Sequence, residues 1–142
     1  MIIGLIVVIA LLLAGTGFGL WRRRVDGRLH DAHRTGASVD EETLSADEIG
    51  AELGSTATLL QFSSAFCQPC RAARTLLTQI ADTTPGVVTV DIDAEHHLDL
   101  VRRLHVMRTP TVLVLDAAGV IHTRASGLPR KDELLSAIHA LA

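Results

Sequence analysis

The stretch Phe66-Cys67-Gln68-Pro69-Cys70-Arg71 contains the only two cysteines of this 142-residue chain, three positions apart. It lies between an apolar, strand-like run at residues 58–62 and a helix-like run at residues 71–81. At such a junction the N-terminal end of the helix stabilises a thiolate, and cysteines at this spacing can close a disulfide. Further along, Arg108-Thr109-Pro110-Thr111 opens another apolar run with a proline. The two stretches together favour thiol–disulfide exchange.

The two cysteines have different expected roles. Cys67 at the helix start is the better thiolate, because free backbone N–H groups and the positive end of the helix favour the charged form. Cys70 lies one turn further in, where it is better shielded and suited to resolve a mixed disulfide. Pro69 pre-sets a helical backbone dihedral in the first turn, and Arg71 adds positive charge near the pair.

Other interpretations of these residues stay open. The cysteines can be small core residues, or they can bind zinc or an iron–sulfur cluster. A zinc site uses four ligands, and the chain has no second cysteine pair; the candidates are then His96, His97 and His105, on or near a predicted helix. Pro110 can simply be the first residue of a strand, where its missing N–H costs little. We expect no metal and no bound cofactor.

Residues 1–20 carry no charged side chain and a single polar one, Thr16. A helix of about twenty residues spans ~30 Å, the thickness of a bilayer core. Trp21 follows as an interfacial anchor, and then come three arginines at positions 22–24. We therefore predict a transmembrane anchor at residues 1–21. A cleavable signal peptide is the competing interpretation, but it carries its positive charge before the apolar core.

The positive flank after this segment predicts a single-pass protein of the cell membrane with its C-terminal part in the cytoplasm. Residues 22–43 are polar and mixed in charge, and we interpret them as a linker. Their arginines fix the topology or rest on anionic headgroups. The net charge of −3 and the lack of a basic stripe argue against a nucleic-acid partner.

The remaining residues, 44–142, predict one small α/β domain. Ser45 and Glu48 form a capping box for a short helix that Gly54 would end. The pattern then predicts strands at 58–62, 87–92, 111–115 and 120–123, with helices at 71–81, 95–104 and 131–141. The expected result is a mixed sheet of about four strands with helices on both faces.

At this point the residues resemble the thioredoxin family, over roughly residues 45–142. The resemblance rests on the Cys67–Cys70 motif, on Arg108-Thr109-Pro110-Thr111, on Asp91-Ile92-Asp93 and on Ser126-Gly127. It implies that Cys67 is the nucleophile, that Cys70 is the resolving thiol and that Pro110 is cis. It also implies a substrate-binding surface that consists of Phe66, Gln68, Pro69, Thr109, Pro110 and Gly127.

The chain departs from the family pattern at several positions. Phe66 and Gln68 stand where the family usually has Trp and Gly, and Gln61 occupies the position of a buried acid. Thr89 stands in place of that acid's usual lysine partner, which avoids an unpaired buried charge. The family's first strand has no clear counterpart in residues 22–43. These departures resemble membrane-tethered thioredoxin-like proteins.

The leading hypothesis is a membrane-anchored thiol–disulfide oxidoreductase that reduces protein disulfides. A reductase or a low-molecular-weight thiol would supply the electrons. A second hypothesis has the domain outside the cell, acting in cytochrome or disulfide maturation. A third is a non-enzymatic module that senses redox state or recruits partners.

Overall fold

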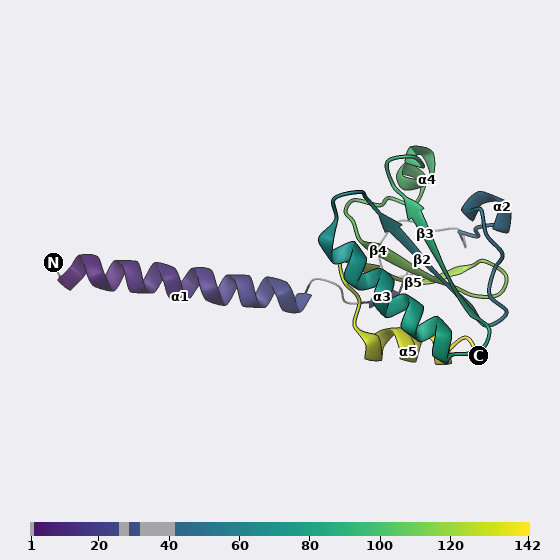
Figure 1. Cartoon of the computed structure of the whole chain (residues 1–142). Coiled ribbons are helices and arrows are strands. Elements are labelled where there is room, and N and C mark those ends of the chain that lie inside the picture. Colours follow the sequence, from purple (N-terminus) through teal and green to yellow (C-terminus); the bar gives the residue numbers. More distant parts are fainter. Residues whose placement is uncertain (1, 26–28, 32–41) are drawn as a thin grey trace.

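A computed structural model of the chain describes residues 2–25, 29–31 and 42–142 (Figure 1). Its elements in chain order are α1 (Ile2–Val25), β1 (Leu29–Asp31), α2 (Ala46–Ile49), β2 (Ala57–Ser63), α3 (Gln68–Thr83), β3 (Val87–Asp93), α4 (Leu98–Arg103), β4 (Thr111–Leu115), β5 (Ile121–Ser126) and α5 (Lys131–His139). Most of the predicted linker, residues 26–28 and 32–41, lies outside the described residues, as do the side chains of the three arginines at 22–24.

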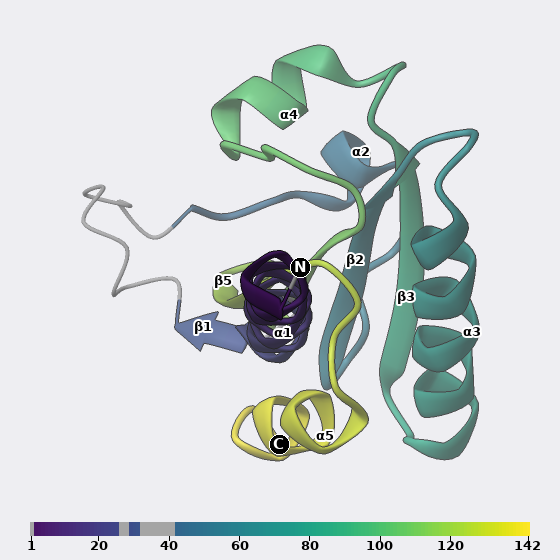
Figure 2. The same ribbon diagram turned by 90° about the vertical axis from the view of Figure 1, so that its left-hand side faces the viewer.

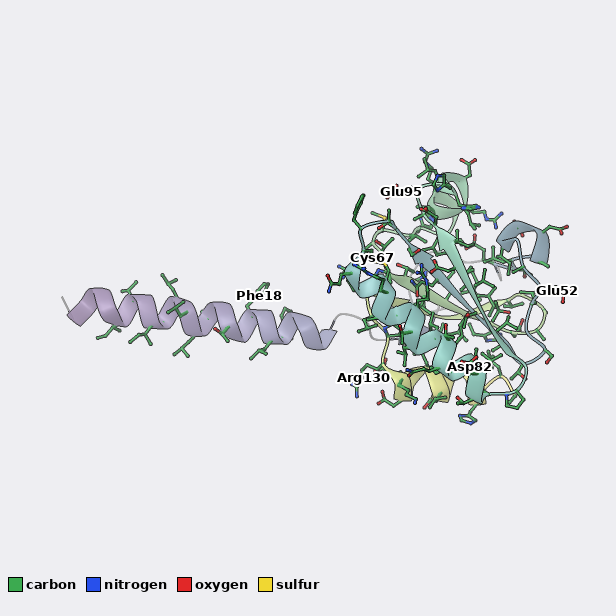
Figure 3. All side chains as sticks on the ribbon, viewed as in Figure 1. Phe18, Glu52, Cys67, Asp82, Glu95 and Arg130 are labelled. Carbon is green, nitrogen blue, oxygen red and sulfur yellow. A yellow bond between two sulfur atoms is a disulfide. The ribbon has the colours of Figure 1, made fainter. Side chains whose placement is uncertain are left out.

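Helix α1 covers the apolar N-terminal segment and extends away from the α/β part of the chain (Figure 1). Its described side chains stand out from the helix on all sides, as at Phe18, which is 59% exposed (Figure 3). Among the described residues, no helix combines the length and the hydropathy needed to cross a membrane. The predicted transmembrane anchor is therefore not confirmed.

The sheet has the order β1-β5-β4-β2-β3. Strands β2 and β3 are parallel, and the other neighbours are antiparallel. The four predicted strands form a mixed sheet, as expected, but the structure adds a fifth. This is β1, a three-residue edge strand inside the predicted linker that pairs with β5 from Leu29 opposite Ala125 to Asp31 opposite Thr123. The prediction missed β1 because its pairing with a distant strand, rather than any local pattern, defines it.

Side chains alternate along β2, and this alternation builds two cores. On one face, Leu59 packs in a cluster with Leu77 of α3 and Leu134 of α5. On the other face, Leu60 and Phe62 pack in a cluster that includes residues from α2 and from the end of α4. Figure 2 shows α3 on one side of β2 and β3, with α2 and α4 on the other. The prediction of helices on both faces is confirmed.

Helix α2 begins at the predicted capping box but ends early. Ser45 is the N-cap, and its side chain accepts the N–H of Glu48, whose carboxylate accepts the N–H of Ser45 in return. The helix stops at Gly50, which has a φ of 67°, and not at the predicted Gly54. Gly54 instead lies so close to the Ala57 carbonyl that a Cβ would clash with it, so its small size serves packing here rather than helix termination.

Candidate redox site

Cys67 and Cys70 form a disulfide at the start of α3, with their Cα atoms 5.2 Å apart. Cys67 is the N-cap residue, and its sulfur accepts the backbone N–H of Cys70 at 3.2 Å. Pro69 lies in the first turn, where no helical N–H is lost. Figure 3 shows Cys67 at the opposite end of α3 from Asp82. The sequence prediction of a cysteine pair at a strand-to-helix junction is confirmed.

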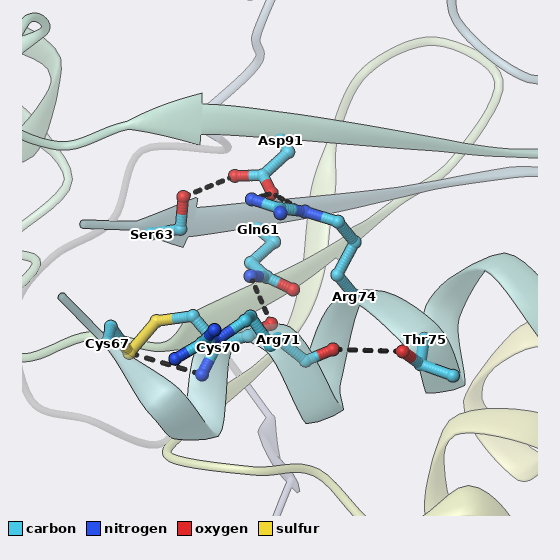
Figure 4. Close-up of polar contacts among 8 residues, drawn as sticks. All are labelled: Gln61, Ser63, Cys67, Cys70, Arg71, Arg74, Thr75 and Asp91. Carbon is cyan, nitrogen blue, oxygen red and sulfur yellow. Dashed lines mark hydrogen bonds and ion pairs between the residues drawn. A yellow bond between two sulfur atoms is a disulfide. The ribbon is translucent and has the colours of Figure 1, made fainter. Parts of the chain in front are cut away.

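The two sulfur-bearing residues differ in exposure. Cys70 is 2% exposed, whereas Cys67 is partly exposed. Beneath Cys70 lies Gln61 of β2, which is 1% exposed and donates from Nε2 to the Cys70 carbonyl at 3.0 Å (Figure 4). Its other amide atom, Oε1, has no hydrogen-bond partner among the described residues. An uncharged amide therefore occupies the buried position next to Cys70.

A chain of hydrogen bonds joins the cysteine turn to the proline loop. The N–H of Cys67 donates to the Ser64 carbonyl, and the Ser64 hydroxyl lies 3.2 Å from that of Thr109. The Thr109–Pro110 peptide bond is cis, as the resemblance implies. The Pro110 carbonyl accepts the N–H of Gly127 at 2.7 Å, and Gly127 has a φ of 106°, which favours glycine. The structure thus brings three predicted stretches together.

The surface around the pair is exposed and partly apolar. Phe66 is 98% exposed, and Gln68 and Pro69 beside it are also exposed. Two further apolar side chains that the sequence analysis did not select belong to the neighbouring loops. Met107, two residues before Thr109, is 90% exposed, and Leu128, after Gly127, is 44% exposed.

Beside the disulfide lies a pocket of about 690 Å³, and Phe66 is among the residues that line it. Its walls come from the end of β2 and the loop after it, from the first two turns of α3 and from the end of β3. Asp91 accepts the hydroxyl of Ser63 at 2.6 Å and forms an ion pair with Arg74 (Figure 4). We did not predict Ser63 or Arg74. The sequence did hold a signal for them. Two predicted strands that pair in parallel end at the same edge of the sheet, and Arg74 lies one helical turn after Cys70.

Asp93 closes the same pocket at the end of β3. Its carboxylate accepts the N–H of Glu95 at 2.9 Å and lies 3.0 Å from Nδ1 of His96. The Glu95 N–H, followed by the His96 contact, lowers the pKa of Asp93 below its ordinary value. Asp93 is therefore a carboxylate at neutral pH.

The histidines considered as metal ligands do not join the cysteines in one cluster. His96 and His97 both contact Asp93, through its carboxylate and its carbonyl respectively. Across the described part of the chain, no three His, Cys, Asp or Glu side chains are grouped so that they could hold a metal ion.

Comparisons with known proteins agree with this geometry. The family model described as thioredoxin matches residues 41–140. Among curated proteins, Thioredoxin H5 of Oryza sativa subsp. japonica is 35% identical over 65 residues, which is 46% of this chain and 47% of that protein. The match thus spans about half the length of this relative.

Solved thioredoxin structures share the fold. Thioredoxin F from spinach chloroplast has 24% identity and a TM-score of 0.54, with 62% of this chain and 72% of that chain covered. Fasciola hepatica thioredoxin has 20% identity and a TM-score of 0.55, with 68% and 88% covered. At these identities the likeness concerns the fold alone. The family model matches most of the sequence, and the fold, the cysteine turn and the cis-proline loop agree with that match. This chain therefore belongs to the thioredoxin family.

Proposed function

We propose that this protein is a thiol–disulfide oxidoreductase whose reduced Cys67–Cys70 dithiol reduces disulfides of other proteins. The observation that carries this proposal is the asymmetry of the pair. Cys67 is accessible at the N-cap of a 16-residue helix, whereas Cys70 is 2% exposed. An external disulfide can therefore meet the first sulfur, while the second is held back for the resolving step.

In the reduced protein, Cys67 is the attacking thiolate. The N-terminal end of α3 and the N–H of Cys70 stabilise its charge. Attack on a substrate disulfide forms a mixed disulfide with Cys67, and the first substrate sulfur leaves and takes up a proton. Cys70 then loses its proton and attacks the Cys67 sulfur, which releases the second substrate thiol. The protein is oxidised by two electrons and the substrate is reduced by two.

The loops around the disulfide support a polypeptide as the substrate. Phe66, Met107 and Leu128 expose large apolar side chains on the three loops that meet there. Large apolar side chains exposed around one site are typical of a surface that binds another protein. Thr109 and Gly127 on the neighbouring loops are partly exposed and Pro110 is buried. We assign these three residues, with Phe66, Gln68 and Pro69, to substrate binding.

Regeneration requires an external source of electrons. We propose a reductase or a low-molecular-weight thiol as the donor, and a cycle that uses no bound cofactor. Each turnover moves two electrons through one dithiol, so the protein itself needs no other redox group.

Trapping tests this mechanism. Cys70→Ser keeps the nucleophile but removes the resolving thiol, so mixed disulfides through Cys67 should accumulate with protein substrates. They should disappear on treatment with dithiothreitol and be absent in a variant that carries both Cys67→Ser and Cys70→Ser. If Cys70→Ser traps nothing while its Cys67 reacts with small disulfides, the chain is not an oxidoreductase of protein disulfides.

We extend the proposal to attachment at the cell membrane through α1, with the α/β part in the cytoplasm. The support is the uncharged sequence of residues 1–20 and the exposure of large apolar side chains on α1, such as 67% at Leu11 and 68% at Leu13. The test is labelling of the cysteines by a membrane-impermeant maleimide after mild reduction. Labelling only after lysis is expected. Labelling of intact cells, or recovery of the protein in the soluble fraction, would contradict this part of the proposal.

A further inference from the structure

The pocket beside the disulfide is large enough for a small molecule. Its volume of about 690 Å³ lies within the range of ligand sites, about 300–1,000 Å³. Cys67 and Cys70 line it, so a molecule held there would have the reacting sulfur within its own boundary. Phe66 also lines the pocket, whereas Met107 and Leu128 do not, so the pocket and the apolar surface assigned to polypeptides share Phe66 and the disulfide.

Four charged side chains line the pocket. Two of them form an ion pair with each other, and the other two are Arg71 and Asp93. Arg74 is committed to Asp91, which also accepts the Ser63 hydroxyl (Figure 4). Arg71 also lines the pocket and is exposed, and within the described residues no carboxylate lies at ion-pair distance from it. Asp93 also lines the pocket, at the end of β3, and is ionised. The pocket therefore presents one available cation from α3 and one carboxylate from the end of β3.

This pattern matches a particular ligand chemistry. In a cysteine-derived molecule, an ammonium and a carboxylate are both attached two carbon atoms from the sulfur. When that sulfur meets Cys67, its charged groups must lie within a few ångströms of it. We propose that the pocket binds low-molecular-weight thiols and disulfides of this zwitterionic class, with Arg71 binding the carboxylate and Asp93 the ammonium. The inference rests on the proposed oxidoreductase function and names a small partner for the same dithiol.

The exchange balances with no further reactant. The reduced protein and one disulfide molecule give the Cys67–Cys70 disulfide and two molecules of thiol. Cys67 forms the mixed disulfide and expels the first thiolate, and Cys70 expels the second. The two protons of the protein dithiol end on the two product thiols. The reverse reaction, in which two thiols reduce the protein, regenerates it.

The test compares four small disulfides with the full-length reduced chain. Cystine carries both charges, cystamine only ammonium groups, 3,3′-dithiodipropionate only carboxylates, and bis(2-hydroxyethyl) disulfide neither. The rate of protein oxidation is followed by quenching with maleimide and mass spectrometry. Each rate is divided by that of free dithiothreitol with the same disulfide, which removes intrinsic reactivity. We expect cystine to exceed the neutral disulfide by about fivefold or more on this scale, as for charge-assisted contacts.

Variants assign the two charges. Arg71→Gln should lower the rates of reaction with cystine and dithiodipropionate at least about threefold. It should leave the rates with cystamine and the neutral disulfide within about twofold of the parent. Asp93→Asn should slow cystine and cystamine but not dithiodipropionate. Arg102→Gln is the matched control, because Arg102 is an exposed arginine of α4 outside this pocket, and it should change none of the four rates.

The failures are distinguishable. Equal normalised rates for all four disulfides would overturn the zwitterion pocket and leave the oxidoreductase proposal standing. If Arg71→Gln slowed the reaction with all four disulfides equally, the zwitterion pocket would also be overturned, because Arg71 would then act on the Cys67 thiolate and not on the ligand. No reaction with any disulfide, with the thiols shown to be free, would overturn the proposed function and this inference with it.

Discussion

The side-chain amide of Gln61 donates to the carbonyl of Cys70 at 3.0 Å, from a position that is 1% exposed. The amide thus couples the interior strand β2 to the first turn of α3, at Cys70. Its Oε1 atom has no partner among the described residues, so one buried acceptor is left over. Gln61 is therefore both a link between sheet and helix and a local cost.

A carboxylate at this position should be poorly tolerated. In Gln61→Glu an uncompensated charge would be buried, so the variant should lose about 2 kcal/mol or more of unfolding free energy at pH 7. Burial raises the folded-state pKa of the new acid, so the loss should grow as pH rises above the unfolded value of about 4.3.

Urea unfolding of the oxidised protein between pH 4 and pH 8 measures this effect. Gln61→Leu is the control, because it removes both the hydrogen bond and the unpartnered Oε1, and it should stay within about 1 kcal/mol of the parent. A Gln61→Glu protein as stable as the parent at pH 7 would show that the site is not closed to water.

Glu48 should contribute to acid stability. The backbone N–H of Ser45, then Arg103, then the Ser45 hydroxyl lower the pKa of Glu48 to about 2. A depressed folded-state pKa gives stability that is present above the ordinary carboxyl pKa of 4.5 and is lost as pH falls towards about 2. The stability difference between the parent and Glu48→Gln should therefore shrink over that range.

Acid-dependent denaturant curves measure this difference. It should be modest, at most about 1 kcal/mol, because the Glu48 side chain is 36% exposed and screened by solvent. Arg103→Gln removes the charged partner of Glu48, so the difference in unfolding free energy between this variant and the parent should also shrink as pH falls. A Glu48→Gln difference that stays constant from pH 5 to pH 2 would contradict the assignment.

Two phenylalanines near the site should behave oppositely. Phe62 is 0% exposed in the core, so Phe62→Ala should cost about 3–5 kcal/mol of unfolding free energy. Phe66 is 98% exposed, so Phe66→Ala should change stability by less than about 0.5 kcal/mol. Thermal and urea unfolding of both variants check the pair. A large loss of unfolding free energy in Phe66→Ala would mean that the Phe66 side chain packs against the rest of the protein in solution.

Phe66→Ala should act on substrate instead. Loss of an exposed aromatic side chain beside Cys67 should slow reaction with a protein disulfide about threefold to tenfold. Reaction with bis(2-hydroxyethyl) disulfide should stay the same, because a small neutral disulfide does not need that surface. Stopped-flow rates for the two substrates give the comparison. An equal slowing of both would assign Phe66 to the chemistry of Cys67 and not to docking.

The sequence predicts those parts of the molecule that depend on local pattern. The periodic apolar face after Cys67 predicts α3, and the capping box at Ser45 predicts the start of α2. Parts that depend on distant pairing are missed. β1 exists only against β5, and the pair between Arg74 and Asp91 requires the register of two parallel strands. The cis state of Pro110 follows from the family resemblance, because a proline before a strand is more often trans.

The most direct test of the account is turnover of a protein disulfide. Insulin is mixed with dithiothreitol and a catalytic amount of the full-length chain, and new thiols are counted over time. The account predicts many turnovers per molecule and, for Cys67→Ser, the rate of dithiothreitol alone. A parent protein that shows only this background rate, while its Cys67–Cys70 disulfide is fully reduced, would contradict the claim that this dithiol is an oxidoreductase site.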